Sequence, residues 1–185
     1  MGVGLFGGAF DPPHLGHVAV ARSAKNELDL LRFVVLVAER PAHKDVLLPA
    51  QTRLDLARAA FPDDEVRLDP YPRTVDLLRA EQFDDPLFVI GADQFADFLS
   101  WQEPNEVLEL TRLAVATRPG FPRERLESVL AQLEHPERVV FFEIEPNPVA
   151  SRDVRARVAT GEPLDGLVPP EVERLIRERG LYHTD

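Results

Sequence analysis

The strongest constraint on the fold is a repeated alternation between short apolar runs and amphipathic stretches along the 185 residues. The apolar runs consist mostly of Val, Leu, Ile and Phe, as is typical of strands covered on both faces of a sheet. We expect strands at residues 2–6, 33–38, 65–68, 87–91, 113–117 and 139–144. Helical spacing lies between them at 15–30, 50–61, 74–82, 103–110 and 123–133, and later at 151–160 and 170–179.

This alternation predicts an α/β fold with a doubly wound parallel sheet. The length suits one domain, and the chain shows neither an internal repeat nor a linker. We therefore expect a single domain over residues 1–185, with helices at its C-terminal end. Ligands of such sheets bind beyond the carboxyl ends of the strands, so candidate functional residues are sought directly after strands.

Composition excludes several classes of function. The formal net charge is -11, and a strongly acidic chain is a poor partner for nucleic acid or an anionic membrane. The absence of cysteine excludes disulfides and thiolate metal sites. No basic region precedes residues 2–6, and no run reaches the ~18 apolar residues of a membrane helix. We expect a cytoplasmic protein, and the sequence leaves its oligomeric state open.

The loop at residues 7–17, Gly-Gly-Ala-Phe-Asp-Pro-Pro-His-Leu-Gly-His, carries the strongest functional signal. Its glycines let the main chain approach a phosphate or ribose, and its prolines favour a helix start. The N–H groups and dipole at that start favour an anion. His14 and His17 share one face of the first turn, and Gly16 between them keeps that face open. Two imidazoles there can donate hydrogen bonds to phosphate oxygens as charge develops.

Other interpretations of this loop are two surface histidines or a zinc site. Zinc requires a third protein ligand, and the sequence offers none beside the histidines, so we predict no metal ligands in the chain. The complete order of residues 8–17 favours the phosphate site. It resembles the signature of the nucleotidyltransferase superfamily with a His-x-Gly-His motif. That resemblance implies a Rossmann-like fold and transfer of a nucleotidyl group.

Residues after later strands extend the candidate site. Lys44 can reach a triphosphate as a mobile point charge, or it belongs to a solvated basic loop. Thr74 is a candidate N-cap. Asp93, which follows Gly91, either caps the next helix or accepts hydrogen bonds from a ribose. Trp101, the only tryptophan, serves packing or ligand binding, and its neighbours suggest a loop or helix end.

The segment at residues 149–155, after the last predicted strand, can bind a phosphate. Ser151 is a candidate N-cap and Arg155 follows one turn later, so hydroxyl, N–H and guanidinium groups can converge there. The alternative is an ordinary capped surface helix. The segment resembles the Ile-Ser-Ser-Thr-x-Ile-Arg motif of the superfamily, but Ala150 replaces a Ser and Arg152 replaces the Thr. Arg152 either substitutes its charge for the missing hydroxyls or points away.

The whole set of matches, from residue 4 to 182, resembles bacterial nicotinate-nucleotide adenylyltransferases. Residues 41–44 are similar to their Pro-x-His-Lys motif, and Thr74-x-Asp76 to their Thr-x-Asp, although Leu77 stands where another Thr is frequent. The resemblance implies transfer of AMP from ATP to nicotinate mononucleotide, with Mg²⁺ accompanying the ATP. ATP and a pyridine mononucleotide are then the expected small-molecule partners, with neither nucleic acid nor membrane involved.

The resemblance also assigns residues to roles. The expected catalytic residues are His14, His17 and Lys44. The expected ATP-binding residues are Gly8, Ala9, Phe10, His14, His17, Gly91, Asp93, Ser151, Arg152 and Arg155. The expected mononucleotide-binding residues are Asp11, Lys44, Thr74 and Trp101, with Trp101 stacking on the nicotinate ring.

Two other functions stay open on the sequence. One is a member of the same superfamily with another acceptor, such as phosphopantetheine, another nucleotide, or a sugar or alcohol phosphate. The other is a non-catalytic nucleotide-binding protein, which the altered Ala150 and Arg152 suggest. The choice between nicotinate and nicotinamide mononucleotide also stays open, because one loop can change it.

Overall fold

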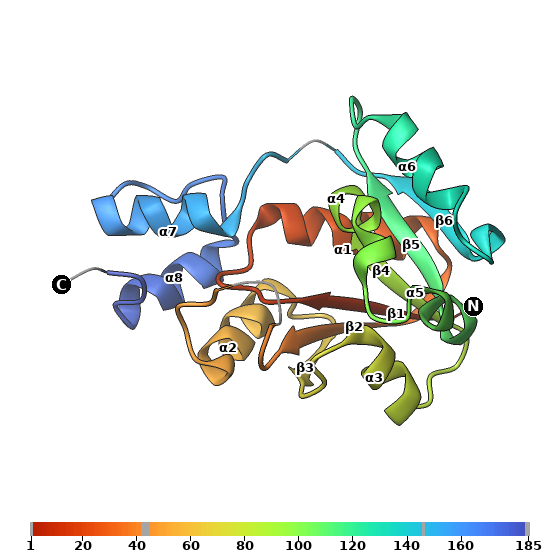
Figure 1. Cartoon of the computed structure of the whole chain (residues 1–185). Coiled ribbons are helices and arrows are strands. Elements are labelled where there is room, and N and C mark those ends of the chain that lie inside the picture. The colour runs from red at the N-terminus through yellow and green to blue at the C-terminus, as the bar shows by residue number, and fades with distance from the viewer. Residues whose placement is uncertain (1, 42–44, 146, 184–185) are drawn as a thin grey trace.

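The computed structural model describes residues 2–41, 45–145 and 147–183. Its described strands form one parallel sheet of six strands in the order β3-β2-β1-β4-β5-β6 (Figure 1). The strands are β1 (Gly2–Gly8), β2 (Leu30–Ala38), β3 (Glu65–Asp69), β4 (Pro86–Gly91), β5 (Arg112–Thr117) and β6 (Val139–Glu143). The predicted doubly wound parallel sheet is therefore confirmed.

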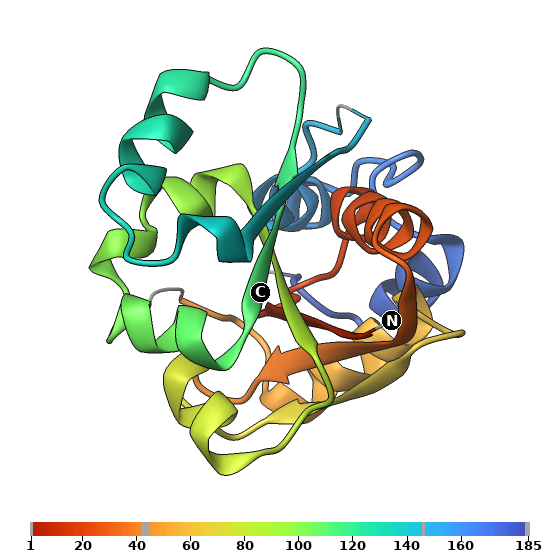
Figure 2. The same ribbon diagram turned by 90° about the vertical axis from the view of Figure 1, so that its right-hand side faces the viewer.

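Helices cover both faces of the sheet (Figures 1 and 2). One face carries α1 (Leu15–Glu27) and α2 (Ala50–Ala60), with α7 (Ser151–Thr160) and α8 (Pro170–Glu178) contributing to the same core. The other carries α3 (Thr74–Ala80), α4 (Ala92–Ala96), α5 (Pro104–Leu110) and α6 (Arg123–Leu130). Two short 3₁₀ turns, η1 (Phe98–Ser100) and η2 (Pro136–Arg138), complete the described helical segments.

The middle residues of the central strands are apolar because both faces of the sheet are buried there. Residues 34–37 of β2 have side chains that are at most 1% exposed, and they alternate between the two cores. Continuous apolar runs of this kind are the expected signature of a parallel strand between two helical layers. This burial explains why the sequence pattern located the central strands of the sheet, whereas the edge strands β3 and β6 are only partly buried.

The ligand edge of the sheet is defined by β1 and its two neighbours, β2 on one side and β4 on the other. Phe6 of β1 lies in register with Val89 of β4, so the strand ends at Gly8 and Gly91 lie at the same level. The connections after β1 and β4 then lead to opposite faces of the sheet, since α1 and α4 pack in different cores. A place where neighbouring connections lead to opposite faces is called a topological switch point. Doubly wound folds bind ligands in the crevice at this point.

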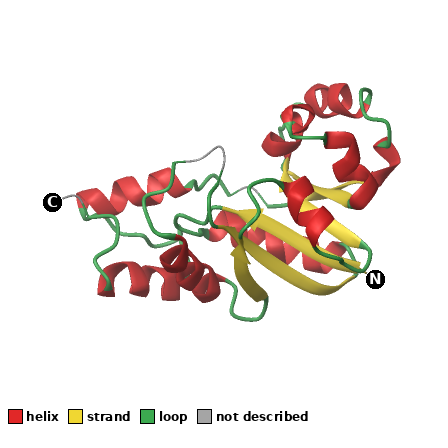
Figure 3. Ribbon diagram, turned by 60° about the horizontal axis from the view of Figure 1, so that its bottom comes forward, coloured by secondary structure: helices red, strands yellow, loops and turns green. Residues whose placement is uncertain are grey.

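The C-terminal helices lie beyond the carboxyl end of β1, beside the first loop (Figures 1 and 3). α8 packs against α2, and the Leu15 N–H at the start of α1 donates to the Leu167 carbonyl at 2.8 Å. The predicted C-terminal helices are thus confirmed as part of the domain core. Within the described ranges, no helix has the length and apolar character required to cross a membrane.

Several local predictions were wrong. α3 begins at Thr74 and α7 at Ser151, with Arg73 and Ala150 at their N-caps, so neither Thr74 nor Ser151 is a cap. Asp93 also does not cap α4, because it lies in the first turn after the N-cap, Gly91. β1 extends to Gly8 and β2 begins at Leu30, where the sequence predicted the end of a helix. α4 and both 3₁₀ turns were not predicted as separate elements.

Candidate active site

The two histidines of the first loop form a stacked pair at the start of α1. Their ring centroids lie 3.7 Å apart with 30° between the ring planes. The main-chain N–H of His14 donates to Nδ1 of His17 at 3.2 Å. Because Nδ1 accepts this hydrogen bond, the neutral ring of His17 carries its proton on Nε2. Nε2 is then a hydrogen-bond donor, which is the role that contact with a phosphate oxygen requires.

Gly16 is needed for a different reason than the sequence suggested. A Cβ atom at this position would lie 2.9 Å from Nδ1 and 3.0 Å from Cε1 of His14. The ring of His14 therefore packs against the Gly16 main chain, and the face is filled rather than open. Gly16 allows the His14 ring to stack beside His17.

Phe10 supports this pair from the core. Its backbone is left-handed, with φ of 50°, and its side chain is 1% exposed. The ring packs edge-on against His17 at a centroid distance of 5.0 Å, and a Cβ at Gly8 would lie 2.9 Å from it. Any contact of Phe10 with ATP would consequently use its main chain, while its ring restrains His17.

The helix start is less available to an anion than the sequence predicted. Leu15 N–H donates to Leu167, and the N–H of His17 donates to the His14 carbonyl at 2.9 Å. The sequence predicted that the N–H groups at this helix start favour an anion, but these two already donate to carbonyls of the protein. The C-terminal segment satisfies one of them instead, as helix ends require some partner.

The start of α7 lies against the first loop. Nη1 of Arg155 donates to the Asp11 carbonyl at 2.6 Å, and Oγ of Ser151 donates to the Pro12 carbonyl at 2.9 Å. The structure thus brings both residues to the histidine loop, as the proposed phosphate grip requires. The Arg152 side chain is 82% exposed and pairs with the carboxylate of its neighbour, Asp153.

Asp11 lies inside the protein and is 3% exposed. Its Oδ2 accepts the main-chain N–H of Leu47 at 2.6 Å, and its Oδ1 accepts the hydroxyl of Tyr182 at 2.7 Å. Burial and this hydrogen bond raise the pKa of Tyr182 far above its ordinary value. The Asp11 carboxylate therefore ties the first loop to two other segments.

A cavity of about 430 Å³ opens on the other side of the β1 end. Four of the predicted residues line it, namely Gly8, Ala9, Thr74 and Trp101. The Trp101 ring lies edge-on to Phe98 and to Phe88, with centroid distances of 5.2 Å and 6.4 Å. These contacts restrain the indole at the cavity wall. The structure also adds residues that the sequence did not single out, including Arg40, Asp69, Tyr71, Arg73 and Gln94.

Comparisons with known proteins identify the family. Residues 5–180 match the family model described as cytidylyltransferase-like. Proteins named "Probable nicotinate-nucleotide adenylyltransferase" from Rubrobacter xylanophilus and Thermus thermophilus are 34% and 36% identical. These alignments cover 100% and 98% of this chain, and 94% and 100% of the two relatives.

The chain belongs to the nicotinate-nucleotide adenylyltransferase family.

Solved structures support the fold assignment for this adenylyltransferase. The nicotinic acid mononucleotide adenylyltransferase of Plasmodium falciparum superposes with a TM-score of 0.76 and 18% sequence identity. The match covers 97% of this chain and 96% of that one. Two structures of the Plasmodium enzyme are described as complexes with APC and with NaAD.

Of the remaining predicted residues of the adenylyltransferase, Gly91 and Asp93 are described in the structure, whereas Lys44 is not. Gly91 and Asp93 lie at the carboxyl end of β4, where Asp93 is exposed. Among the described residues, and leaving out its neighbours along the chain, no atom lies within 4 Å of the ideal Cβ position of Gly91, so the space beside its main chain is open. Lys44 lies outside the described residues, together with His43 of the same motif. Their roles therefore stay predictions.

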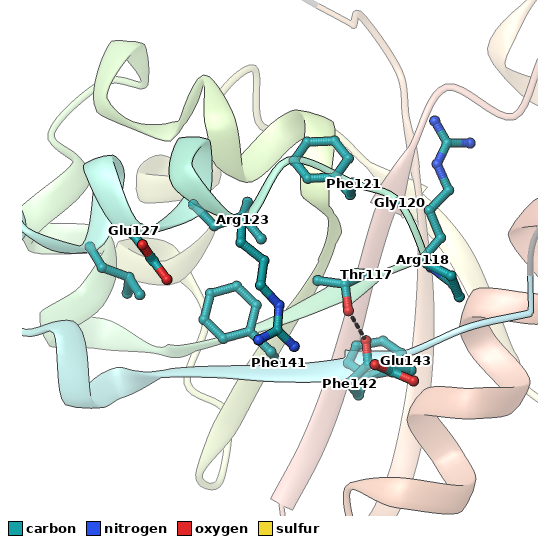
Figure 4. Close-up of a pocket in the computed structure, with 12 residues that line it drawn as sticks. Thr117, Arg118, Gly120, Phe121, Arg123, Glu127, Phe141, Phe142 and Glu143 are labelled. Carbon is teal, nitrogen blue, oxygen red and sulfur yellow. Dashed lines mark hydrogen bonds between the residues drawn. The ribbon is translucent and has the colours of Figure 1, made fainter.

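A second cavity, of about 510 Å³, lies between α6 and the outer strands (Figure 4). Phe121, Arg123 and Phe141 are among its lining residues, whereas no residue of the predicted site belongs to it. In Figure 4 the side chain of Arg118 extends away from α6. Among the described residues, no group of three or more His, Cys, Asp or Glu side chains is arranged to hold a metal ion.

Sequence inspection missed Arg53 and Tyr182. Arg53 is 1% exposed and is the largest fully buried side chain among the described residues. Its position shares a helix face with the buried Ala57 and Ala60, four and seven residues later. A charged residue on an otherwise apolar helix face was the signal available in the sequence. Tyr182 offered no comparable signal, because its partner lies 171 residues away.

We predict that Gly16→Ala disrupts the histidine pair. The added methyl group cannot occupy the space of the His14 ring, and a displacement of about 1 Å at a reacting centre can cost about 10²-fold in rate. The turnover number should fall while the thermal unfolding midpoint changes little. Asn26→Ala, on the exposed part of the same helix, is the control and should retain activity. Unchanged turnover in Gly16→Ala would contradict the packing role.

A second prediction concerns Asp69 in the Trp101 cavity. Burial raises the pKa of Asp69, and the hydrogen bond from Tyr71 N–H opposes only part of this shift. The folded state therefore binds the proton more tightly than the unfolded state, so this group reduces stability as pH rises from the ordinary carboxyl pKa to the raised one. Asp69→Asn should stabilise the protein at neutral pH, because an amide oxygen can still accept from Tyr71.

Thermal unfolding measured across pH tests this sign. The advantage of Asp69→Asn over the wild type should shrink as pH falls through the Asp69 titration, where the wild-type carboxyl also becomes neutral. An advantage that stays constant over the whole acid range would show that the effect does not come from the buried charge.

Proposed function

We propose that this chain transfers AMP from ATP to nicotinate mononucleotide, giving nicotinate adenine dinucleotide and pyrophosphate. The observation that carries the proposal is the placement of the stacked His14–His17 pair and the Trp101 cavity on two sides of the β1 end. One polyphosphate and one aromatic mononucleotide can then meet at the switch point of the sheet. The names of the relatives, and the NaAD and APC complexes of the Plasmodium enzyme, support the same reaction.

In the proposed reaction, a 5′-phosphate oxygen of the mononucleotide attacks the α-phosphorus of ATP. A new phosphorus–oxygen bond forms, the bond from the α-phosphorus to the bridging oxygen breaks, and pyrophosphate leaves with that electron pair. No protein nucleophile is required. The protein contributes by positioning the reactants and stabilising the charge on the phosphate oxygens. His17 Nε2 donates to one of these oxygens, and His14 lies beside it.

We assign the triphosphate to the side where α7 meets the first loop. Arg155 uses one of its five N–H groups on the Asp11 carbonyl, so other donors of the same guanidinium can bind phosphate. Ser151 and the exposed Arg152 lie on the same first turn of α7. Lys44 would add a further positive charge. Gly8, Ala9 and Phe10 contribute main-chain contacts, while Gly91 and Asp93 serve the nucleoside.

We assign the mononucleotide to the cavity beside Trp101. The indole offers a π-face to the pyridine ring, and Thr74 at the start of α3 lies at the same wall. Both carboxylate oxygens of Asp11 already accept hydrogen bonds inside the protein. Asp11 would therefore affect mononucleotide binding indirectly, by fixing the position of the first loop.

Mg²⁺ fits this site as a partner of the ATP. The described residues offer no cluster of three or more His, Cys, Asp or Glu side chains. Mg²⁺ usually retains several waters and binds nucleotide phosphates with few protein ligands, so the phosphates and water would hold it. When bound, it neutralises charge on the phosphate oxygens.

A pyrophosphate-release assay with a panel of acceptors tests the assignment. With ATP, nicotinate mononucleotide should give equal amounts of pyrophosphate and nicotinate adenine dinucleotide. Nicotinamide mononucleotide in parallel measures the preference between the two pyridines, and 4′-phosphopantetheine tests another branch of the superfamily. Turnover of 4′-phosphopantetheine with neither pyridine mononucleotide would refute the proposal. ATP binding by calorimetry without pyrophosphate from any acceptor would indicate a non-catalytic protein.

We predict that His17→Ala loses transition-state stabilisation. Removing one such donor typically costs about 10²–10³-fold in turnover. The comparison uses saturating ATP and mononucleotide, so that weaker binding does not account for the loss. His135→Ala is a matched control. His135 is half exposed, precedes the amino end of β6 and contacts Glu137, whereas the candidate site lies at the carboxyl ends of the strands. Near wild-type turnover in His17→Ala would disprove the role assigned to this ring.

A further inference from the structure

The buried guanidinium of Arg53 donates hydrogen bonds to four main-chain carbonyls. It donates to Ala9 and Ala38 at 2.8 Å each, to Glu39 at 3.0 Å and to Leu48 at 3.1 Å. Burying a charged group is costly unless it is hydrogen-bonded, and these contacts use four of its five N–H groups. Arg53 itself is 1% exposed, so it cannot also bind a ligand.

The carbonyls come from different segments of the chain. Ala9 belongs to the first loop, whereas Ala38 and Glu39 lie at the end of β2 and directly after it. Ala9 and Ala38 both line the Trp101 cavity, as do Arg40 and Pro41, which follow Glu39. The guanidinium, which does not itself line the cavity, therefore joins the wall formed by the first loop to the wall formed by the end of β2.

A buried carboxylate, that of Asp11, acts on Arg53 through its charge. Burial lowers the pKa of the Arg53 guanidinium, and the negative charge of Asp11 is the largest effect that opposes this shift. Asp11 in turn accepts hydrogen bonds from Leu47 N–H and from the Tyr182 hydroxyl. We call Asp11, Arg53 and Tyr182 the polar hub. It connects the first loop, the segment after β2 and the C-terminal end of the described chain.

We propose that Arg53 is a positioning residue that sets the spacing between the first loop and the segment after β2 around the mononucleotide cavity. This inference rests on the proposed function for its choice of substrate. It assigns no contact with substrate to Arg53. The guanidinium acts through the Ala9, Ala38 and Glu39 carbonyls, whose positions determine where the cavity walls stand.

The chemistry of Arg53 suits this role better than bulk or charge alone. A guanidinium is planar and presents its donors in a fixed fork, so it can hold several carbonyls at defined relative positions. An ammonium group has the same charge but only three donors around one nitrogen. A lysine at this position could not satisfy the same four acceptors in the same plane.

The test compares Arg53→Lys with the wild type in steady-state kinetics. We expect the KM for nicotinate mononucleotide to rise and kcat/KM to fall by about 10- to 100-fold, as small misplacements of binding groups can produce. The KM for ATP should change less, because the Ala38 and Glu39 carbonyls lie on the mononucleotide side and only Ala9 is also assigned to ATP. Quenching of Trp101 fluorescence by the mononucleotide provides a second, equilibrium readout, since the chain has one tryptophan.

Two control variants separate positioning from stability. Thr111→Val removes a fully buried hydroxyl that donates to the Pro86 carbonyl at 2.9 Å, at the amino edge of the sheet. Arg112→Lys alters an arginine that pairs with Asp85 at the same edge. Both should keep the wild-type KM for the mononucleotide, whatever they do to the unfolding midpoint. A folded Arg53→Lys enzyme with unchanged KM and unchanged Trp101 titration would overturn the proposal.

Tyr182→Phe keeps the proposal testable if Arg53→Lys does not fold. It removes one hydrogen bond to the Asp11 carboxylate and keeps the ring. We expect a smaller rise of the same KM, with ATP again less affected. Loss of stability with no change in that KM would show that the hub has a structural role only.

A turnover-independent measurement distinguishes failure of this inference from failure of the proposed function. If the wild type releases no pyrophosphate with either pyridine mononucleotide, the proposed function fails, and hydrogen exchange then tests the hub. Exchange at residues 7–11 and 38–40 should accelerate in Arg53→Lys, because both segments lose fixed partners. Exchange at the start of β5, beside the control positions Thr111 and Arg112, should not change. Equal exchange of the hub segments in the wild type and in Arg53→Lys would refute the inference.

Discussion

The location of β1 between β2 and β4 is the constraint on which the candidate site depends. Because α1 and α4 pack on opposite faces, the loops after β1 and β4 diverge and leave the strand ends at Gly8 and Gly91 accessible between them. The histidine pair then lies on the α1 side, and the Trp101 cavity lies on the side of α3 and α4. In the proposed reaction, two substrates approach from these two sides and meet above one strand. The topology therefore creates the meeting point, and the side chains only select what binds there.

The acidic composition makes the local distribution of charge important. A net charge of -11 would repel a triphosphate, but exposed charges more than about 8–10 Å away are largely screened at physiological salt. Arginines close to the strand ends therefore decide the local field. They occupy two distinct environments: Arg155 is half-buried against the first loop and Arg152 is exposed, whereas Arg53 is enclosed by carbonyls. In the binding mode we propose, the first two exchange their present partners for phosphate oxygens, and Arg53 supports the loop instead.

The sequence predicted the features that depend on local periodicity or on short motifs. Strands buried on both faces appear as continuous apolar runs, and the first-loop motif located His14 and His17 beside the strand end. α4 has only five residues, too few to show a helical period. The N-cap predicted at Ser151 was wrong because Ser151 is already the first residue of α7, with Ala150 at the N-cap. Its hydroxyl instead donates to the Pro12 carbonyl, 139 residues earlier. Contacts of that kind, including Tyr182 with Asp11, form only once the chain has folded, and no local pattern encodes them.

The glycines of the first loop show how the family signature works at the level of packing. Gly8 accommodates the Phe10 ring and Gly16 accommodates the His14 ring, so both serve contacts within the loop itself. Phe10 then packs against His17, whose Nδ1 accepts the His14 N–H. Each contact removes a rotation that the ligand would otherwise have to restrict. A loop arranged in this way before binding spends less interaction energy on ordering, and more of that energy stays available for the transition state. The spacing of the motif is consequently as much a requirement of the loop's own packing as of the phosphate chemistry.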